Sequence, residues 1–174
     1  MAEADAKLKG NRGVALVVAF LVFVFDQAMK WVVTVPLDLK GQPGREIHIL
    51  PFFDLRWVEN RGVSLGLLSA DGQVGRWLLV AMTAAIAIFV AVWLWRERRR
   101  TDAVALAMVL GGALGNIVDR TRFGYVVDYA DLHFGAWRPF LVFNVGDAAI
   151  TIGVLLLLVR ALLMRDGKAS KKEA

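Results

Sequence analysis

Four long apolar stretches constrain this chain more than any other feature. A helix that crosses a bilayer needs about 20 mostly apolar residues, because each residue adds about 1.5 Å toward a hydrocarbon thickness of about 30 Å. Residues of about 13–35, 74–95, 103–118 and 140–163 meet this requirement. The 174-residue chain is 57% hydrophobic and 21% charged, which is more apolar surface than a soluble domain of this size can bury. We therefore predict a single integral membrane domain, residues 1–174, that is mainly α-helical with four transmembrane helices.

The basic residues predict the direction in which these helices cross. Lys and Arg gather at the cytoplasmic ends of spans. The N-terminal tail, the turn at 96–102 and the end from Arg160 share one side of a four-span chain, and together they hold twelve basic and six acidic residues. The remainder holds nine basic and ten acidic residues. We predict that both termini are cytoplasmic, and that the positive charge marks topology and not a nucleic-acid partner.

The first apolar stretch also has the basic start and apolar run of a secretory signal peptide. Such a segment ends at a small-x-small cleavage site. Residues 31–36 are mostly bulky or β-branched instead. We therefore expect the stretch to be a retained membrane anchor.

Two segments, 34–73 and 121–139, face outward in this topology. Within the first, residues 45–50 and 52–58 alternate polar and apolar side chains and are bounded by Pro and Gly, as short strands are. We expect a small sheet on the outer membrane surface with Trp57, Phe52 and Phe53 at the interface. The second segment is short, polar and aromatic, and we expect a loop there.

Polar residues inside the apolar stretches are the best pointers to function, because they are costly in lipid. They lie at Asp26, Gln27 and Lys30 in the first stretch, at Asn116, Asp119 and Arg120 near the end of the third, and at Asn144 and Asp147 near the start of the fourth. Three pairs among them are spaced by three or four residues, so that each pair shares one helix face: Asp26–Lys30, Asn116–Asp119 and Asn144–Asp147. Given the directions of crossing, all three pairs lie at one depth in the outer third of the bilayer. We expect these faces to turn toward one another.

Local pairing is the simpler interpretation of the same residues. Asp26 with Lys30, and Asp119 with Arg120, would then be ion pairs, and Asn144 an interhelical hydrogen bonder. Asp147 and the nearby Asp128 have no basic neighbour in sequence, which argues against pairing as the whole explanation. Gly111 and Gly115 have the GxxxG spacing that allows a neighbouring helix to approach closely and tighten the cluster.

The residue inventory restricts the chemistry to carboxylates. The chain has no cysteine, no serine in a nucleophile-elbow pattern and no zinc-type HExxH spacing, so we expect no metal and no cofactor. We expect His48 and His133, each alone on a loop, to be surface residues. Two aspartates close together share one proton and can hydrolyse a peptide bond with water as the nucleophile. Asp128 and Asp147 are the best candidates for such a pair.

Two other functions fit the same pattern. A proton-coupled transporter also places carboxylates within helices, although four spans without an inverted repeat or a broken helix argue against it. A structural subunit could use the polar cluster only to join helices.

The ordered motifs resemble lipoprotein signal peptidase, also called signal peptidase II. They are Asp26-Gln-x-x-Lys30, Asn60-x-Gly62, Gly111-Gly-x-x-Gly-Asn-x-x-Asp-Arg120, Val126-x-Asp128 and Phe143-Asn-x-x-Asp147. They run from the first apolar stretch to the last. One departure is Gly146, where the family usually has Ala before the second catalytic aspartate.

The resemblance implies a bacterial inner-membrane aspartic endopeptidase with its active site near the periplasmic face. It would remove the signal peptide from diacylglyceryl-modified prolipoproteins by cutting before the lipidated cysteine. The catalytic pair would be Asp128 and Asp147. The supporting or substrate-binding residues would be Asp26, Lys30, Asn60, Gly62, Asn116, Asp119, Arg120 and Asn144.

The resemblance also implies partners and outward structure. The partners would be the prolipoprotein, membrane lipid and inhibitors of the globomycin type, and we expect a monomer. The outward segments would form a small β-cradle from 34–73 and a short periplasmic helix or loop over the site from 121–139.

Overall fold

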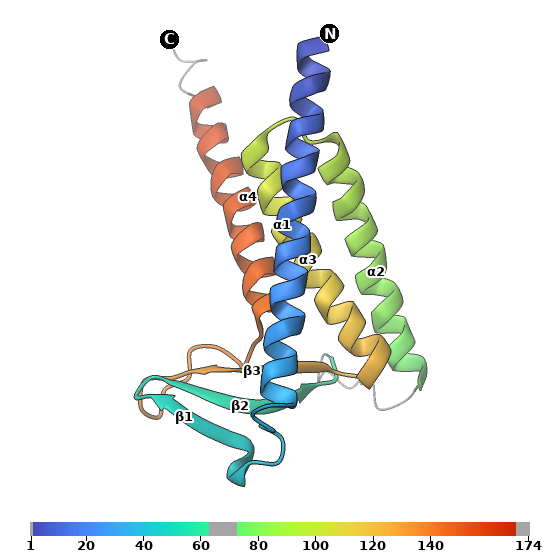
Figure 1. Cartoon of the computed structure of the whole chain (residues 1–174). Coiled ribbons are helices and arrows are strands. Elements are labelled where there is room, and N and C mark those ends of the chain that lie inside the picture. The colour runs from blue at the N-terminus through green and yellow to red at the C-terminus, as the bar shows by residue number, and fades with distance from the viewer. Residues whose placement is uncertain (1, 63–72, 170–174) are drawn as a thin grey trace.

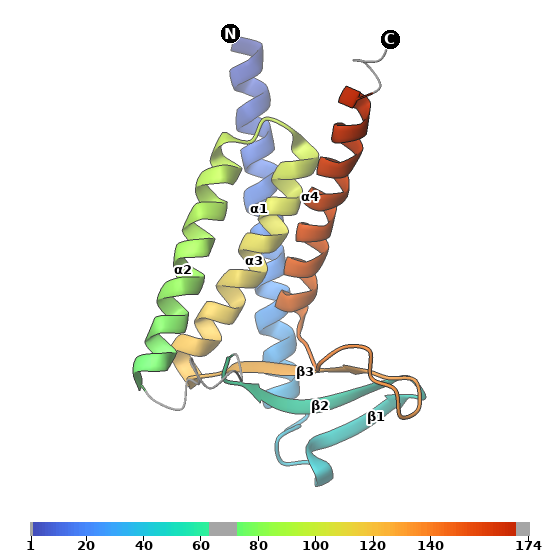
Figure 2. The same cartoon turned by 180° about the vertical axis from the view of Figure 1, so that it is seen from behind.

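A computed structural model describes residues 2–62 and 73–169 and confirms a membrane protein of mainly α-helical class (Figure 1). The four helices are α1 (Ala2–Thr34), α2 (Gln73–Arg96), α3 (Arg100–Phe123) and α4 (Val145–Ala169). Within the described residues, each contains a stretch long and apolar enough to cross a membrane. The two chain ends lie at one end of the bundle and the sheet lies at the other (Figures 1 and 2).

The helix bounds differ from the predicted ones in two places that bear on function. α3 continues past residue 118 to Phe123, and α4 begins at Val145 and not at residue 140. The first difference arises because Asp119 faces the protein interior and not lipid, being 1% exposed, so the helix need not end where the apolar run ends. The second leaves Asn144 immediately before α4.

α3 is the central helix and contacts the other three. Half of its membrane window is buried, against 17–28% for the windows of α1, α2 and α4. The GxxxG spacing explains the approach of α1. A Cβ added to Gly111 would lie 2.5 Å from the backbone oxygen of Ala19, and one added to Gly115 would lie 2.2 Å from Oδ2 of Asp26. The predicted role of these glycines in tightening the polar cluster is therefore confirmed.

Replacing Gly111 tests this packing. We expect Gly111→Ala to lower the unfolding temperature, because a backbone oxygen cannot move aside as a flexible side chain can. The control is Gly13→Ala in α1, where an added Cβ would meet nothing within 4 Å and Ala has the better helix propensity by about 1 kcal/mol. Thermal unfolding in detergent should order the proteins as Gly13→Ala at or above wild type, and Gly111→Ala below it. The reverse order would contradict the packing.

The sheet has three antiparallel strands in the order β1-β2-β3. A short 3-10 turn (Pro43–Arg45) leads into β1 (Glu46–Leu50), which pairs with β2 (Phe53–Asn60) as the alternating pattern predicted. The third strand, β3 (Val126–Leu132), was not predicted. The expectation of a helix or loop in 121–139 is met by the end of α3 and by the irregular residues on both sides of β3, but not by β3 itself. The strand carries Asp128 and is buried for six of its seven residues.

An apolar core joins the sheet to the outward end of α1. Its buried members are Val33, Leu39, Trp57, Val127, Tyr129 and Ala130. Trp57 is only 6% exposed and its ring meets Tyr125 edge-on at 6.5 Å, so its predicted place at the membrane interface is wrong. Phe52 is 45% exposed and is available for that role. This core fixes β3, and therefore Asp128, beneath the outer ends of α1 and α3.

Candidate active site

The start of α4 is built as a capping box. Asn144 precedes the first helical residue, and its Oδ1 accepts the N–H of Asp147 at 2.9 Å, while Oδ2 of Asp147 accepts the N–H of Asn144 at 3.2 Å. The N–H of Gly146 donates to Oδ1 of Asp26 at 2.8 Å. These acceptors satisfy donors that a helix N-terminus otherwise leaves unpaired. The cap therefore fixes the Asp147 carboxylate at a helix N-terminus, where the helix dipole favours negative charge.

A buried ionic centre, formed by Asp26, Lys30 and Asp119, joins α1 to α3. Nζ of Lys30 lies 2.8 Å from Oδ2 of Asp26 and 2.9 Å from Oδ2 of Asp119. All three side chains are at most 5% exposed. Nε2 of Gln27 donates to Oδ1 of Asp119 at 3.1 Å. The second oxygen of Asp119 also accepts the N–H of Val127 at 3.1 Å, which ties the ionic centre to β3.

Asn116 connects the ionic centre to the catalytic candidates. Its Oδ1 accepts a hydrogen bond from Nζ of Lys30 at 3.0 Å, and its Nδ2 donates to Oδ1 of Asp147 at 2.8 Å. The side chain is 7% exposed. Both ends of this amide are thus used, which fixes its orientation and that of the carboxylate it meets.

Asp128 is held by two asparagine amides. Nδ2 of Asn144 donates to its Oδ1 at 2.6 Å and Nδ2 of Asn60 donates to its Oδ2 at 3.0 Å. Asn60 is itself positioned by the N–H of Gly62, which donates to its Oδ1 at 3.1 Å. Gly62 has φ +109° and passes Leu79 so closely that a Cβ would lie 2.5 Å from Cδ1 of that leucine. Asn144 contacts both Asp128 and Asp147, and so links the two carboxylates.

The surroundings of Asp128 favour its protonated form. Burial and then the neighbouring charge of Asp147 raise the pKa of Asp128 to about 7, although the amides of Asn60 and Asn144 act in the opposite direction. Asp128 is 2% exposed. Two linked carboxyl groups, of which one retains a proton near neutral pH, form the arrangement that activates water for peptide hydrolysis.

Two cavities open onto this pair from different sides. One, of about 300 Å³, follows the start of α4 and is lined by Asp147 together with Phe140, Leu141 and Ile152. The other, of about 510 Å³, lies against β2 and is lined by Asp128, Asn60 and Gly62. Leu141 lines both. The two cavities therefore adjoin at Leu141, with one of the two aspartates in the lining of each.

The structure brings nearly all of the predicted site residues into one network. The network contains Asp26, Lys30, Asn60, Gly62, Asn116, Asp119, Asp128, Asn144 and Asp147. Arg120 makes no direct hydrogen bond to this network among the described residues, but its charge interacts with those of Asp147, Asp128 and Asp119. The predicted Asp119–Arg120 ion pair is not formed, because adjacent residues on a helix point to different sides, and Asp119 pairs with Lys30 instead. Nε of Arg120 is buried and has no hydrogen-bond partner among the described residues.

Sequence reasoning missed two features of the outer region. Gln27 was predicted only as a polar residue that interrupts the first apolar stretch, with no partner assigned, yet its amide contacts Asp26, Asp119 and the carbonyl of Gly115. The histidines were expected alone at the surface. Both lie beside Asp54, and the side chain of His133 is only 13% exposed.

Comparison with known proteins agrees with this geometry. The family model described as signal peptidase (SPase) II matches residues 18–163. The chain is 54% identical to the lipoprotein signal peptidase of Sphingopyxis alaskensis over 91% of this chain and 90% of the relative. It is 56% identical to that of Rhizorhabdus wittichii over 91% of both chains.

A solved structure shows the same fold. It is described as a bacterial membrane enzyme, and it superposes with a TM-score of 0.76 and 27% identity over 90% of this chain and 92% of the other. The family match includes α2, α3, the sheet, most of α4, the outward half of α1 and every residue of the carboxylate network. The chain therefore belongs to the signal peptidase II family of proteases.

Proposed function

We propose that this protein is the membrane aspartic endopeptidase that removes signal peptides from diacylglyceryl-modified prolipoproteins, cutting before the lipidated cysteine, and that Asp128 and Asp147 are its catalytic residues. The single observation that carries the assignment is Asn144, whose amide donates to Asp128 while its backbone N–H and side-chain oxygen hold Asp147. One residue thus sets the relative position of both carboxylates.

The different surroundings of the two aspartates support different roles for them in the proposed reaction. Asp147, whose carboxylate accepts hydrogen bonds from the N–H of Asn144 and from Nδ2 of Asn116, takes a proton from water. The water oxygen attacks the carbonyl carbon of the scissile bond, while Asp128 donates its proton to the carbonyl oxygen. When the carbon–nitrogen bond breaks, the proton taken by Asp147 goes to the leaving amine and Asp128 recovers its own. Asn116, Asn60 and Asn144 orient the pair and do not react.

The two cavities support the substrate class. The apolar cavity beside Asp147 faces the helices and suits the signal peptide and acyl chains, while the cavity beside Asp128 contains Arg56 and Arg138 at the level of the sheet. We place the active site near the periplasmic face and both termini in the cytoplasm, because the basic residues gather at the end of the bundle that holds the termini, and the sheet lies at the opposite end. The site is complete within one chain, which supports a monomer.

Cleavage of a defined substrate tests the proposal. Purified protein in lipid vesicles should process a diacylglyceryl-modified prolipoprotein, and globomycin should prevent the processing. The control is the same prolipoprotein without the lipid, which should remain intact or react far more slowly. Equal processing of both forms, or processing insensitive to globomycin, would contradict the proposed substrate.

The pH dependence of cleavage tests the role of Asp128. Because its pKa is raised to about 7, Asp128 loses its proton as the pH rises through neutrality, and kcat/KM should fall about tenfold per pH unit above that point. The folded state binds the proton more tightly than the unfolded state, so stability should also decrease from pH 5 to pH 8, and less so in Asp128→Asn. A cleavage rate that is flat or rising between pH 7 and 9 would contradict the assignment.

A further inference from the structure

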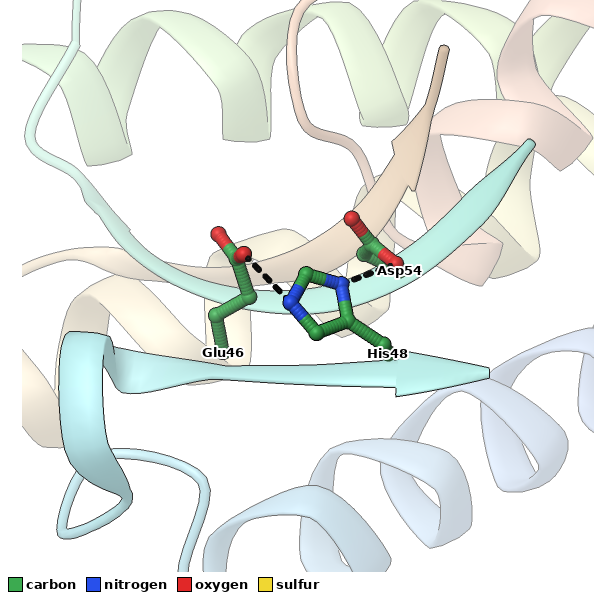
Figure 3. A group of neighbouring side chains, drawn as sticks. All are labelled: Glu46, His48 and Asp54. Carbon is green, nitrogen blue, oxygen red and sulfur yellow. Dashed lines mark hydrogen bonds and ion pairs between the residues drawn. The ribbon is translucent and has the colours of Figure 1, made fainter. Parts of the chain in front are cut away.

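Away from the active site, the only two histidines of the chain converge on one carboxylate of the sheet. Nδ1 of His48 lies 3.0 Å from Oδ1 of Asp54, and Nε2 of His133 lies 2.9 Å from Oδ2 of the same residue. Nε2 of His48 lies 3.3 Å from Oε1 of Glu46. Figure 3 shows the Glu46 and Asp54 carboxylates directed at the two sides of the His48 ring.

Strand pairing brings these residues together. His48 of β1 and Asp54 of β2 are direct cross-strand partners. Glu46 precedes His48 by two residues and so lies on the same face of β1. His133 follows the end of β3, where its N–H donates to the carbonyl of Phe52 at 3.0 Å. The cluster is therefore a product of the sheet register and not of a local sequence motif.

The two carboxylates of the cluster, those of Glu46 and Asp54, would favour a bound cation. The neighbouring Asp131 has its own cationic partners, since Arg138 lies 3.0 Å and Arg56 3.6 Å from its Oδ2. Asp54 and Glu46 are paired with imidazole nitrogens instead, and an imidazole can release its proton and bind a metal ion.

We propose that Glu46, His48 and Asp54 bind a divalent cation of the zinc type, with His133 positioning Asp54 from its other oxygen. One imidazole nitrogen and two carboxylate oxygens are a donor set that zinc accepts, with water completing the coordination. A hydrogen-bonded partner behind a ligating carboxylate is the usual arrangement around such sites. The imidazole excludes a pure oxygen-ligand site, which magnesium or calcium would prefer.

The donor atoms lie close enough together that binding an ion requires only a small movement of the side chains. One donor atom from each of the three residues lies within 4.8 Å of the others, and zinc bonds of about 2.0–2.2 Å require them to come somewhat closer. The His48 side chain is 78% exposed and can turn to present one nitrogen. The bound ion would join β1 to β2 and, through His133, to the end of β3, without entering the catalytic network.

Zinc titration of the purified protein tests this proposal. The protein must be free of a histidine tag. The chain has no cysteine and no histidine beyond these two, so zinc binding by other thiol or imidazole groups is then absent. Calorimetric titration with Zn²⁺ at pH 7.5 should show one saturable site. His48→Gln and Glu46→Gln, both at accessible side chains, should each weaken binding at least tenfold. Mg²⁺ should bind at least tenfold more weakly than Zn²⁺.

Asp38→Asn is the matched control, because it removes an exposed carboxylate of the same outward segment outside the cluster. It should bind Zn²⁺ within twofold of wild type. Zn²⁺ should also raise the unfolding temperature of wild type and Asp38→Asn but not of His48→Gln, and all three should cleave substrate equally. Absence of saturable binding in wild type, or equal affinity in His48→Gln, would overturn the proposal and leave His48 as an imidazole paired with two carboxylates.

Discussion

Asp128→Asn and Asp147→Asn should each reduce prolipoprotein cleavage by at least about 10²–10⁴-fold, the usual contribution of a positioned acid or base. Asparagine keeps the size of the side chain and part of its hydrogen bonding but can neither hold nor transfer the proton. Because the two groups act as a unit, the double variant should be hardly slower than either single one. Single-turnover cleavage in lipid vesicles measures all three.

The folded state must be intact for this result to be informative. We expect both variants to unfold within a few degrees of wild type, and Asp128→Asn to be at least as stable at pH 8, because it removes the cost of ionising a carboxyl that is 2% exposed. Asp38→Asn, at an exposed carboxylate away from the site, should cleave at the wild-type rate. More than a tenth of the wild-type rate in either catalytic variant would exclude that residue from the chemistry.

Lys30→Met should cause the largest loss of stability among single substitutions in the network. It leaves Asp26 and Asp119 facing each other without the cation that lies 2.8 and 2.9 Å from them. Removing one partner of a buried ion pair costs about 3–5 kcal/mol, because the other charge remains buried. For a chain of this length, this corresponds to an unfolding temperature lower by about 10 °C. Activity should fall as well, since Lys30 also holds the oxygen of Asn116.

Lys40→Met provides the matched comparison. Lys40 also pairs with a carboxylate at 2.8 Å, that of Glu59, but its side chain is 51% exposed. An exposed pair contributes about 0–1 kcal/mol, so the unfolding temperature should move by about 2 °C or less. If Lys30→Met and Lys40→Met unfold at the same temperature, the buried ion cluster does not stabilise the protein as described.

The polar network could be predicted because a membrane restricts the structure strongly. Once the spans are assigned, the rise of the helix fixes the depth of each residue, and spacing of three or four fixes its face. This places Asp26, Asn116 and Asp147 together from sequence alone. The finer partners could not be read in this way. Asn144 at three residues from Asp147 fits a helix face as well as a cap, and only the start of α4 at Val145 decides in favour of the cap.

The outer sheet was less predictable because its pairing is long-range. β3 contains Asp128 and Asp131, which interrupt an apolar strand pattern, and its partner β2 comes from the other outward segment. His133 is distant in sequence from His48, and no short motif connects either histidine to Asp54. Only the strand pairing brings the three residues together. Local patterns report periodicity and spacing, whereas a site assembled across three strands depends on register.

Mass spectrometry of the cleavage products tests the central claim most directly. Wild-type protein should release a signal peptide that ends at the residue before the lipidated cysteine, and a mature chain that begins with that cysteine and a free α-amine. Asp128→Asn and Asp147→Asn should yield neither product in the same time. Cleavage at another bond by wild type, or the same two products from either variant, would contradict the account.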